Sequence, residues 1–188
     1  MRTVTPQHGF TLTEMAVTVA VLAILAAIAA PSFQETLNKR RLIGAAEQLY
    51  ADLQYARSEA AKRNAYVVVT FTGTGSTWCY GISTASCSCT ATSGPSLCQL
   101  DGVTKVVDQQ GFKNVSLTGN TFPGGATAFE PQRGIARLPS NAIAFGTATF
   151  TVNAGASNAR TSEVVVSSFG RVIICSPSSA RLAEYPAC

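Results

Sequence analysis

The residues of this chain whose types could carry chemistry are few: one histidine, ten carboxylic acids and six cysteines among 188 residues. The histidine, His8, stands close to the N-terminus, and the later positions hold no histidine to act as a catalytic base or metal ligand. The acids are scattered along the chain without a paired arrangement. No catalytic residue and no cofactor are predicted, and a non-enzymatic role is favoured.

The cysteines could in principle bind zinc or form disulfides. The first four follow the spacing C-x7-C-x-C-x8-C, which lacks the closely paired cysteines of structural zinc sites. An even number of cysteines is typical of disulfides in a domain outside the cytoplasm, so three bridges and no metal site are predicted. The preferred pairs are Cys175 with Cys188, Cys89 with Cys98, and Cys79 with Cys87. The connectivity among the first four cysteines stays open.

An apolar segment near the N-terminus comes before all of the cysteines. Eighteen of the 24 residues at positions 10–33 are apolar, and Glu14 carries the only charge among them. As a helix, residues 10–30 would extend about 30 Å, the thickness of the hydrocarbon core of a bilayer. A transmembrane helix is therefore predicted. A cleaved secretory signal is the alternative, but Glu14 argues against it, because a membrane penalises a carboxylate near its centre by about 2.5 to 3.5 kcal/mol.

The residues around the start of this segment carry a recognisable motif. The leader MRTVTPQHG ends in Gly9 and is followed by Phe10, then TLT, then Glu14. This pattern resembles the prepilin signature of type IV pilins and of the pseudopilins of type II secretion. The resemblance implies that a prepilin peptidase cuts after Gly9, methylates the new N-terminal Phe10 and removes His8 with the leader. Glu14 is then expected to pair with the N-terminal amine of a neighbouring subunit, which would set the axial register of a filament.

The rest of the chain predicts a long helix followed by short strands. Residues 34–63 have apolar positions at helical spacing, and Asn64 is a plausible end of the helix. Residues 64–188 contain β-branched and aromatic runs separated by turn residues, at positions 66–72, 77–83, 103–107, 114–118, 142–152, 163–168 and 170–176. The expected organisation is a leader (1–9), a transmembrane and assembly helix (10–33), an amphipathic helix (34–63) and a disulfide-bonded β-rich head (64–188). The predicted fold class is α+β.

Two further stretches narrow the resemblance. AEQLYADLQYARSEAAKRNAYVVVTF and EVVVSSFGRVIIC resemble the end of the helix and the closing hairpin of the GspH/FimT family of minor pilins and pseudopilins. Membership implies a head with two antiparallel sheets against the helix, and a low-abundance subunit near the tip of a filament. It also implies partners among other pilins or pseudopilins. The expected location is the inner membrane, with the head in the periplasm, and later a pilus or pseudopilus.

The charge of the chain leaves a binding function open. Fourteen Lys and Arg against ten acids give a formal net charge of +4, which is small for a dedicated nucleic-acid binder. Some FimT-like proteins capture double-stranded DNA through a G-R-x-R sequence, and here Gly170 and Arg171 are kept while Ile173 replaces the second arginine. The candidate DNA-binding residues are Arg133, Arg137, Arg160, Arg171 and Arg181. DNA uptake and a type II secretion role are both kept as alternatives to a pilus.

Overall fold

The structure is a computed structural model that describes residues 9–188, apart from the side chains of Ala30 and Pro31. What was predicted for residues 1–8, including the loss of His8, lies outside the described residues. The chain divides into two compact units, one that ends at Leu37 and one that spans Asn38–Cys188. Each unit is described by itself.

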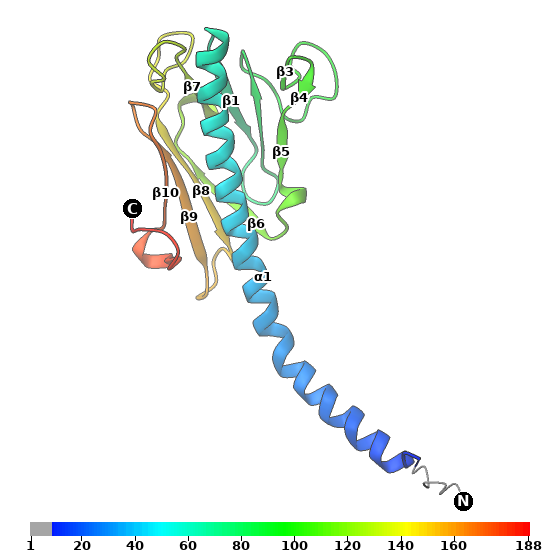
Figure 1. Cartoon of the computed structure of the whole chain (residues 1–188). Helices are drawn as coiled ribbons and strands as arrows, with labels where there is room; N and C mark the ends of the chain where they lie inside the picture. The colour runs from blue at the N-terminus through cyan, green and yellow to red at the C-terminus, as the bar shows by residue number, and fades with distance from the viewer. Residues whose placement is uncertain (1–8) are drawn as a thin grey trace, which may run out of the picture. The chain divides into compact units, whose positions relative to one another are not determined.

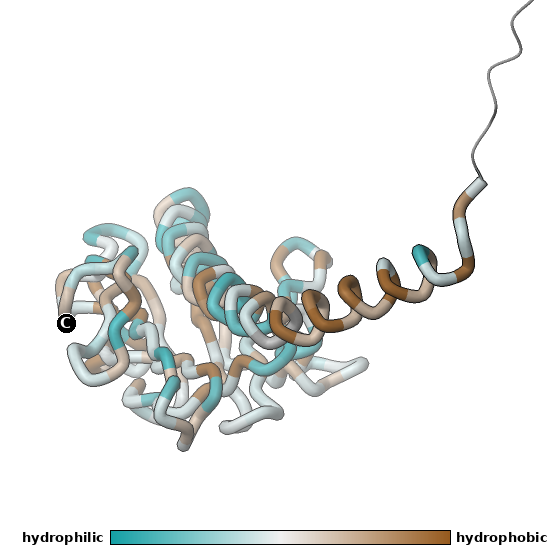
Figure 2. The backbone as a smooth tube through the Cα atoms, turned by 90° about the horizontal axis from the view of Figure 1, so that it is seen from below, coloured by the Kyte–Doolittle hydropathy of each residue, from teal (hydrophilic) through white to brown (hydrophobic). Residues whose placement is uncertain are grey.

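A single helix, α1 (Leu12–Arg63), begins in the first unit and continues into the second. In the first unit the described side chains of α1 are exposed as far as Thr36. Most of these residues are apolar, as the hydropathy colouring of Figure 2 shows. Within the described residues, α1 is the one helix that is long and apolar enough to cross a membrane. An isolated helix that is apolar all round has no face to turn towards water, so its composition suits hydrocarbon better.

In the second unit, α1 is amphipathic as predicted. Its fully buried positions recur every three or four residues, and they are Leu42, Ala45, Ala46, Leu49, Leu53, Ala56 and Ala60. The helix ends at Arg63, as expected, because Asn64 takes a left-handed conformation with φ of 50°. Asparagine tolerates this conformation better than most residues, so it can terminate a helix.

The second unit has the predicted α+β fold, with α1 packed on two four-stranded antiparallel sheets (Figure 1). The first sheet has the order β5 (Val106–Asp108), β2 (Cys79–Ser83), β1 (Val67–Thr72), β7 (Ala126–Phe129). The second has the order β10 (Val172–Cys175), β9 (Arg160–Val166), β8 (Gly146–Val152), β6 (Val115–Asn120). A separate pair consists of β3 (Gln99–Leu100) and β4 (Val103–Thr104), and the short 3-10 helices are η1 (Gln109–Gly111), η2 (Pro123–Gly125) and η3 (Ser178–Ala180).

Several strand predictions differ from the structure. The strand predicted at 142–152 begins at Gly146, that predicted at 163–168 spans Arg160–Val166, and the short β3 was not predicted. The run at 103–107 is two strands, because the backbone changes partner at Lys105, which receives a hydrogen bond from Ile82 and donates one to Cys98. β7 was not predicted, since its sequence ATAF is rich in alanine, which has a low strand propensity. All four residues of β7 are nevertheless buried, so tertiary packing rather than local propensity makes this strand.

Aromatic side chains fill the space between α1 and the sheets. Trp78 is buried, its ring lies 5.0 Å from that of Phe150 in an edge-to-face arrangement, and its Nε1–H donates to the carbonyl of Val115 at 2.9 Å. The hydroxyl of Tyr80 donates to Asp52 of α1 at 2.7 Å. Burial, together with the Asp52 carboxylate, raises the pKa of the Tyr80 phenol well above its usual range. The helix is thus joined to the first sheet by a polar contact as well as by apolar packing.

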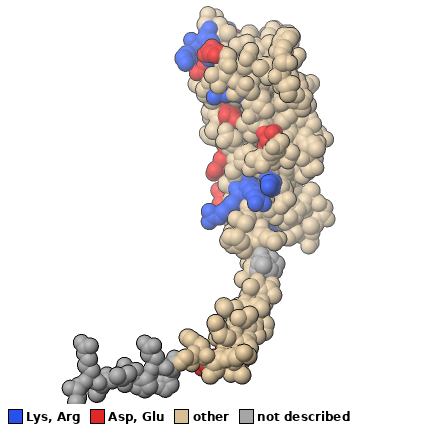
Figure 3. All heavy atoms as spheres, turned by 90° about the vertical axis from the view of Figure 1, so that its right-hand side faces the viewer, with Lys and Arg blue, Asp and Glu red and all other residues tan. Residues whose placement is uncertain are grey.

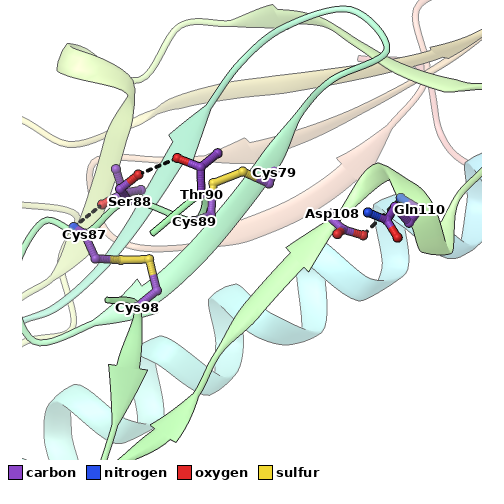
Figure 4. The surroundings of a disulfide bond; sticks show 9 residues. Cys79, Cys87, Ser88, Cys89, Thr90, Cys98, Asp108 and Gln110 are labelled. Atoms are coloured by element: carbon purple, nitrogen blue, oxygen red, sulfur yellow. Dashed lines mark hydrogen bonds between the residues drawn. A yellow bond between two sulfur atoms is a disulfide. The ribbon is translucent and has the colours of Figure 1, made fainter. Parts of the chain in front are cut away.

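All six cysteines form disulfides, but two of the three predicted pairs were wrong. The bond between Cys175 and Cys188 is present, whereas the other bonds join Cys79 to Cys89 and Cys87 to Cys98 (Figure 4). The reason lies in the path of the loop. Its backbone folds back so that the amide of Ser88 donates to the carbonyl of Ser96, which brings Cys87 and Cys98 to a Cα separation of 5.1 Å. The predicted bonds Cys89–Cys98 and Cys79–Cys87 therefore do not form.

One glycine of β2 makes this arrangement possible. A Cβ atom built at Gly81 would overlap the sulfur of Cys98, which lies directly over the strand. Only a residue without a side chain leaves room for the disulfide at this position. The Cys87–Cys98 bond thus depends on a residue of a neighbouring strand that lies outside the loop between the two cysteines.

Candidate functional site

The start of α1 is a site built by two side chains of the predicted motif. The backbone N–H of Thr11 donates to Glu14 Oε2 at 2.9 Å, and the Thr11 hydroxyl donates to the same oxygen at 2.8 Å. In return, the backbone N–H of Glu14 donates to the Thr11 hydroxyl at 3.2 Å. This is a capping box, in which two side chains satisfy backbone donors that have no partner inside the helix.

The capping box explains how a carboxylate can be placed at the end of an apolar helix. Glu14 lies in the first turn, where the partial positive charge of the helix N-terminus favours an anion. Both of its hydrogen bonds involve Oε2, and no partner of Oε1 is found among residues 9–188. Glu14 can therefore cap its own helix and still offer one oxygen to a cation from outside the chain.

The residues next to Glu14 are suited to contact other apolar surfaces. Phe10 is 84% exposed and Leu12 is 86% exposed, and the following turns expose large apolar side chains as well. Gly9 has open space around it, since a Cβ there would meet nothing within 4 Å. The predicted cleavage between Gly9 and Phe10 would therefore fall at an accessible peptide bond, directly before the capping box.

The five candidate DNA-binding arginines are divided between two ends of the second unit. Arg160 begins β9, and Arg171 directly precedes β10, at the opposite end of the same hairpin. The six steps from Arg160 to Val166, at about 3.3 Å each, separate the two ends by about 20 Å. Arg181 belongs to the Arg160 end, because the adjacent Leu182 N–H donates to Ser176 Oγ, which donates to the Thr161 carbonyl.

The other two candidates lie towards the Arg171 end. Arg133 is exposed and adjoins Gly134, whose carbonyl lies against Gly170. Arg137 is partly engaged, since its guanidinium donates to Asn141 Oδ1 at 2.6 Å. Charged side chains are sparse on the face of the molecule seen in Figure 3. The structure does not bring the five arginines into one patch.

An ion network that sequence reasoning missed joins the end of α1 to the cysteine-rich loop. The Arg63 guanidinium donates to both oxygens of Asp101, which forms the turn between β3 and β4, and to the buried Glu59. Hydrogen bonds from Arg63 hold the pKa of the Asp101 carboxyl and that of the Glu59 carboxyl below their usual values. Asp101 also takes a positive φ of 51°, followed by Gly102, which is a turn signal readable in the sequence.

Among the described residues, one group of side chains gathers atoms of types that could bind a metal: Glu163, Cys175 and Cys188. Both sulfurs are used in a disulfide, so the group offers one carboxylate and no thiolate.

Comparison with family models identifies the family to which this chain is similar. Residues 45–170 match the family model described as type II transport protein GspH, and residues 5–30 match the prokaryotic N-terminal methylation motif. Two crystal structures of the type IV minor pilin FimU of Pseudomonas aeruginosa (strain PAO1) are similar, with TM-scores of 0.45. Their identities are 20% and 19%, over 74% and 76% of this chain and 100% and 92% of theirs. No curated protein matches the chain.

Proposed function

The chain belongs to the GspH family, and we propose that it is a minor pilin that joins a type IV pilus through its N-terminal helix, within the tip or priming complex. In this proposal the chain is first anchored in the inner membrane with its head in the periplasm. A prepilin peptidase removes residues 1–9 and methylates Phe10. Other major and minor pilins are then its partners in the filament.

One observation carries the proposal: the capping box leaves Glu14 Oε1 without a partner in an apolar, exposed helix. Cleavage after Gly9 would create a cationic amine on Phe10, four residues before this carboxylate. A charge in hydrocarbon is costly unless it is paired, so a carboxylate from one chain and an amine from the next stabilise each other when helices pack together. This pairing would set the axial offset between neighbouring subunits of the filament.

Two substitutions at Glu14 separate assembly from capping. Glu14→Gln keeps a capping-box residue but removes the charge, whereas Glu14→Ala removes both. If the charge is what the neighbour binds, both variants are processed and reach the membrane, and neither is found in sheared filaments. Thr18→Ala is a matched control from the next helical turn, where the Thr18 hydroxyl only donates to the Met15 carbonyl. Wild-type amounts of Glu14→Gln in filaments would show that this reasoning is wrong.

A pseudopilus of a type II secretion system is the main alternative, and the description of the matching family favours it. Deletion of the chain in its own host distinguishes the two. A minor pilin of the tip complex is expected to reduce surface pili strongly and leave protein secretion intact. Intact pili with a loss of secreted enzymes would assign the chain to the secretion machine instead.

DNA capture has less support, because the candidate arginines lie at two ends about 20 Å apart and Arg137 is engaged with Asn141. Phosphate contacts gain affinity when several cations act together. We expect no salt-sensitive gel shift of duplex DNA by the full chain in detergent at micromolar concentration. A shift that Arg171→Gln and Arg160→Gln both weaken would restore DNA uptake as the function.

A further inference from the structure

β10 is an edge strand with open hydrogen-bonding positions. The Arg171 carbonyl accepts from Ser167 on the β9 side, and bonded pairs alternate along an antiparallel ladder. Val172 and Ile174 therefore direct their N–H and C=O groups away from β9. Across the described residues these four groups have no hydrogen-bond partner. An edge of this kind is a template for an additional strand.

The C-terminal tail of the chain already pairs with this edge at Ser176, directly after the end of β10. Beyond β10, the Ser176 N–H donates to the Pro186 carbonyl at 2.9 Å, and the Cys188 N–H donates to the Ser176 carbonyl at 3.3 Å. This short parallel pairing is held in place by the Cys175–Cys188 disulfide. The edge thus accepts a strand at Ser176, and the tail leaves Val172 and Ile174 uncovered.

A groove of about 790 Å³ follows the uncovered part. Its walls are Tyr50 and Gln54 of α1 on one side and β10 with the tail on the other. Val165, Val172, Ile173 and Ile174 supply apolar side chains to the lining, and Ile173 is 39% exposed. The groove therefore combines open backbone groups with apolar side chains, which is the combination that strand addition uses for affinity and specificity.

The positive charge at the Arg171 end of the groove indicates which kind of ligand should bind there. Arg171 is the only charged side chain in the lining, and its guanidinium has no partner within residues 9–188. Arg57 of α1 lies against Gly134, which in turn touches Gly170, so a second cation adjoins this end. No carboxylate side chain lines the groove. An acidic group on the ligand at this end would meet Arg171 in the lining, with Arg57 nearby.

We propose that the open edge of β10 binds an extended segment of a partner polypeptide, which adds as a fifth strand to the second sheet. Apolar residues of this segment alternate into the groove, and a carboxylate side chain lies beside Arg171. The site lies in the second unit and does not include Glu14, so it goes beyond filament assembly through Glu14. It would give the head its own contact with a neighbouring protein.

The test uses the full chain in dodecyl maltoside micelles and two synthetic peptides, acetyl-Glu-Val-Thr-Val-Thr-Val-amide and its counterpart with Lys in place of Glu. Hydrogen exchange at the amides of Val172 and Ile174 should slow when the Glu peptide is added. The Glu peptide should bind about fivefold more tightly than the Lys peptide, as expected for one exposed ion pair of close to 1 kcal/mol.

Charge reversal supplies the control. Arg171→Glu should invert the preference in favour of the Lys peptide, whereas Arg181→Glu makes the same charge change at the other end of the unit and should leave the preference unchanged. Ile174→Pro removes one outward N–H and should weaken both peptides, since proline is tolerated at an edge. The proposal is overturned if Val172 and Ile174 show no protection at millimolar peptide. It is also overturned if Arg171→Glu leaves the preference unaltered, or if duplex DNA rather than peptide protects these amides.

Discussion

The pairing of the four cysteines in the loop allows a sharp test, because paired and crossed substitutions have different consequences. Replacing Cys87 and Cys98 by alanine removes one bridge and leaves Cys79–Cys89 intact. Replacing Cys89 and Cys98 takes one sulfur from each bridge, so both bonds are lost and two thiols remain. Both variants lack two sulfur atoms and differ only in which bonds survive.

The expected cost follows from the loops that the bridges close. The bonded cysteines are separated by 10 and 11 residues. Loops of this size are worth about 3 kcal/mol each in the chain-entropy model. The paired variant should lose about 3 kcal/mol of unfolding free energy and the crossed variant about 6. At roughly 2 to 4 °C per kcal/mol for a domain of this size, the midpoints should fall by about 6 to 12 °C and about 12 to 24 °C.

Thermal unfolding by circular dichroism gives the two midpoints, and thiol titration in denaturant without reductant gives the bonding directly. The paired variant should show no free thiol and the crossed variant two. The opposite result, with two thiols in Cys87→Ala/Cys98→Ala and none in Cys89→Ala/Cys98→Ala, would refute the connectivity described above. Equal midpoints for the two variants would refute the magnitude argument.

Two further predictions concern contacts around the same loop. Gly81→Ala should destabilise the chain by about 1 to 3 kcal/mol in urea unfolding, because its Cβ would collide with a disulfide sulfur, whereas Gly111→Ala, with open space around it, should change little. The lowered pKa values of Glu59 and Asp101 mean that their contribution to stability is present above pH 4.5 and is lost as the pH falls below it. Midpoints measured from pH 7 to pH 3 should therefore fall less in Arg63→Met than in the wild type, and an equal fall would contradict the network.

Local patterns in the sequence were sufficient for several elements. The helical spacing of Leu42, Leu49 and Leu53 predicted the buried face of α1, and the turn residue Asn64 predicted its end. The β-branched runs at 66–72, 163–168 and 170–176 predicted β1 and the β9–β10 hairpin. These features depend on residues within a few positions of each other, where spacing and propensity are informative.

Features that depend on contacts between residues far apart in the sequence were harder to predict from it. The split at Lys105 and the strand β7 depend on which backbone lies alongside, and propensity does not contain that information. The link from Arg63 to Asp101 spans 38 positions and has no local signature. The arginines Arg160 and Arg171 are close in sequence, but an antiparallel hairpin places them at opposite ends.

The sequence by itself determined the motif from Gly9 to Glu14, the apolar helix that follows it and the α+β class, because each is a local pattern of residue types. Only the tertiary structure decided the path of the cysteine-rich loop and the open edge of β10. The physical reason is that cysteines bond only where the fold brings their Cα atoms within about 7 Å, and an edge is open only where no other segment covers it.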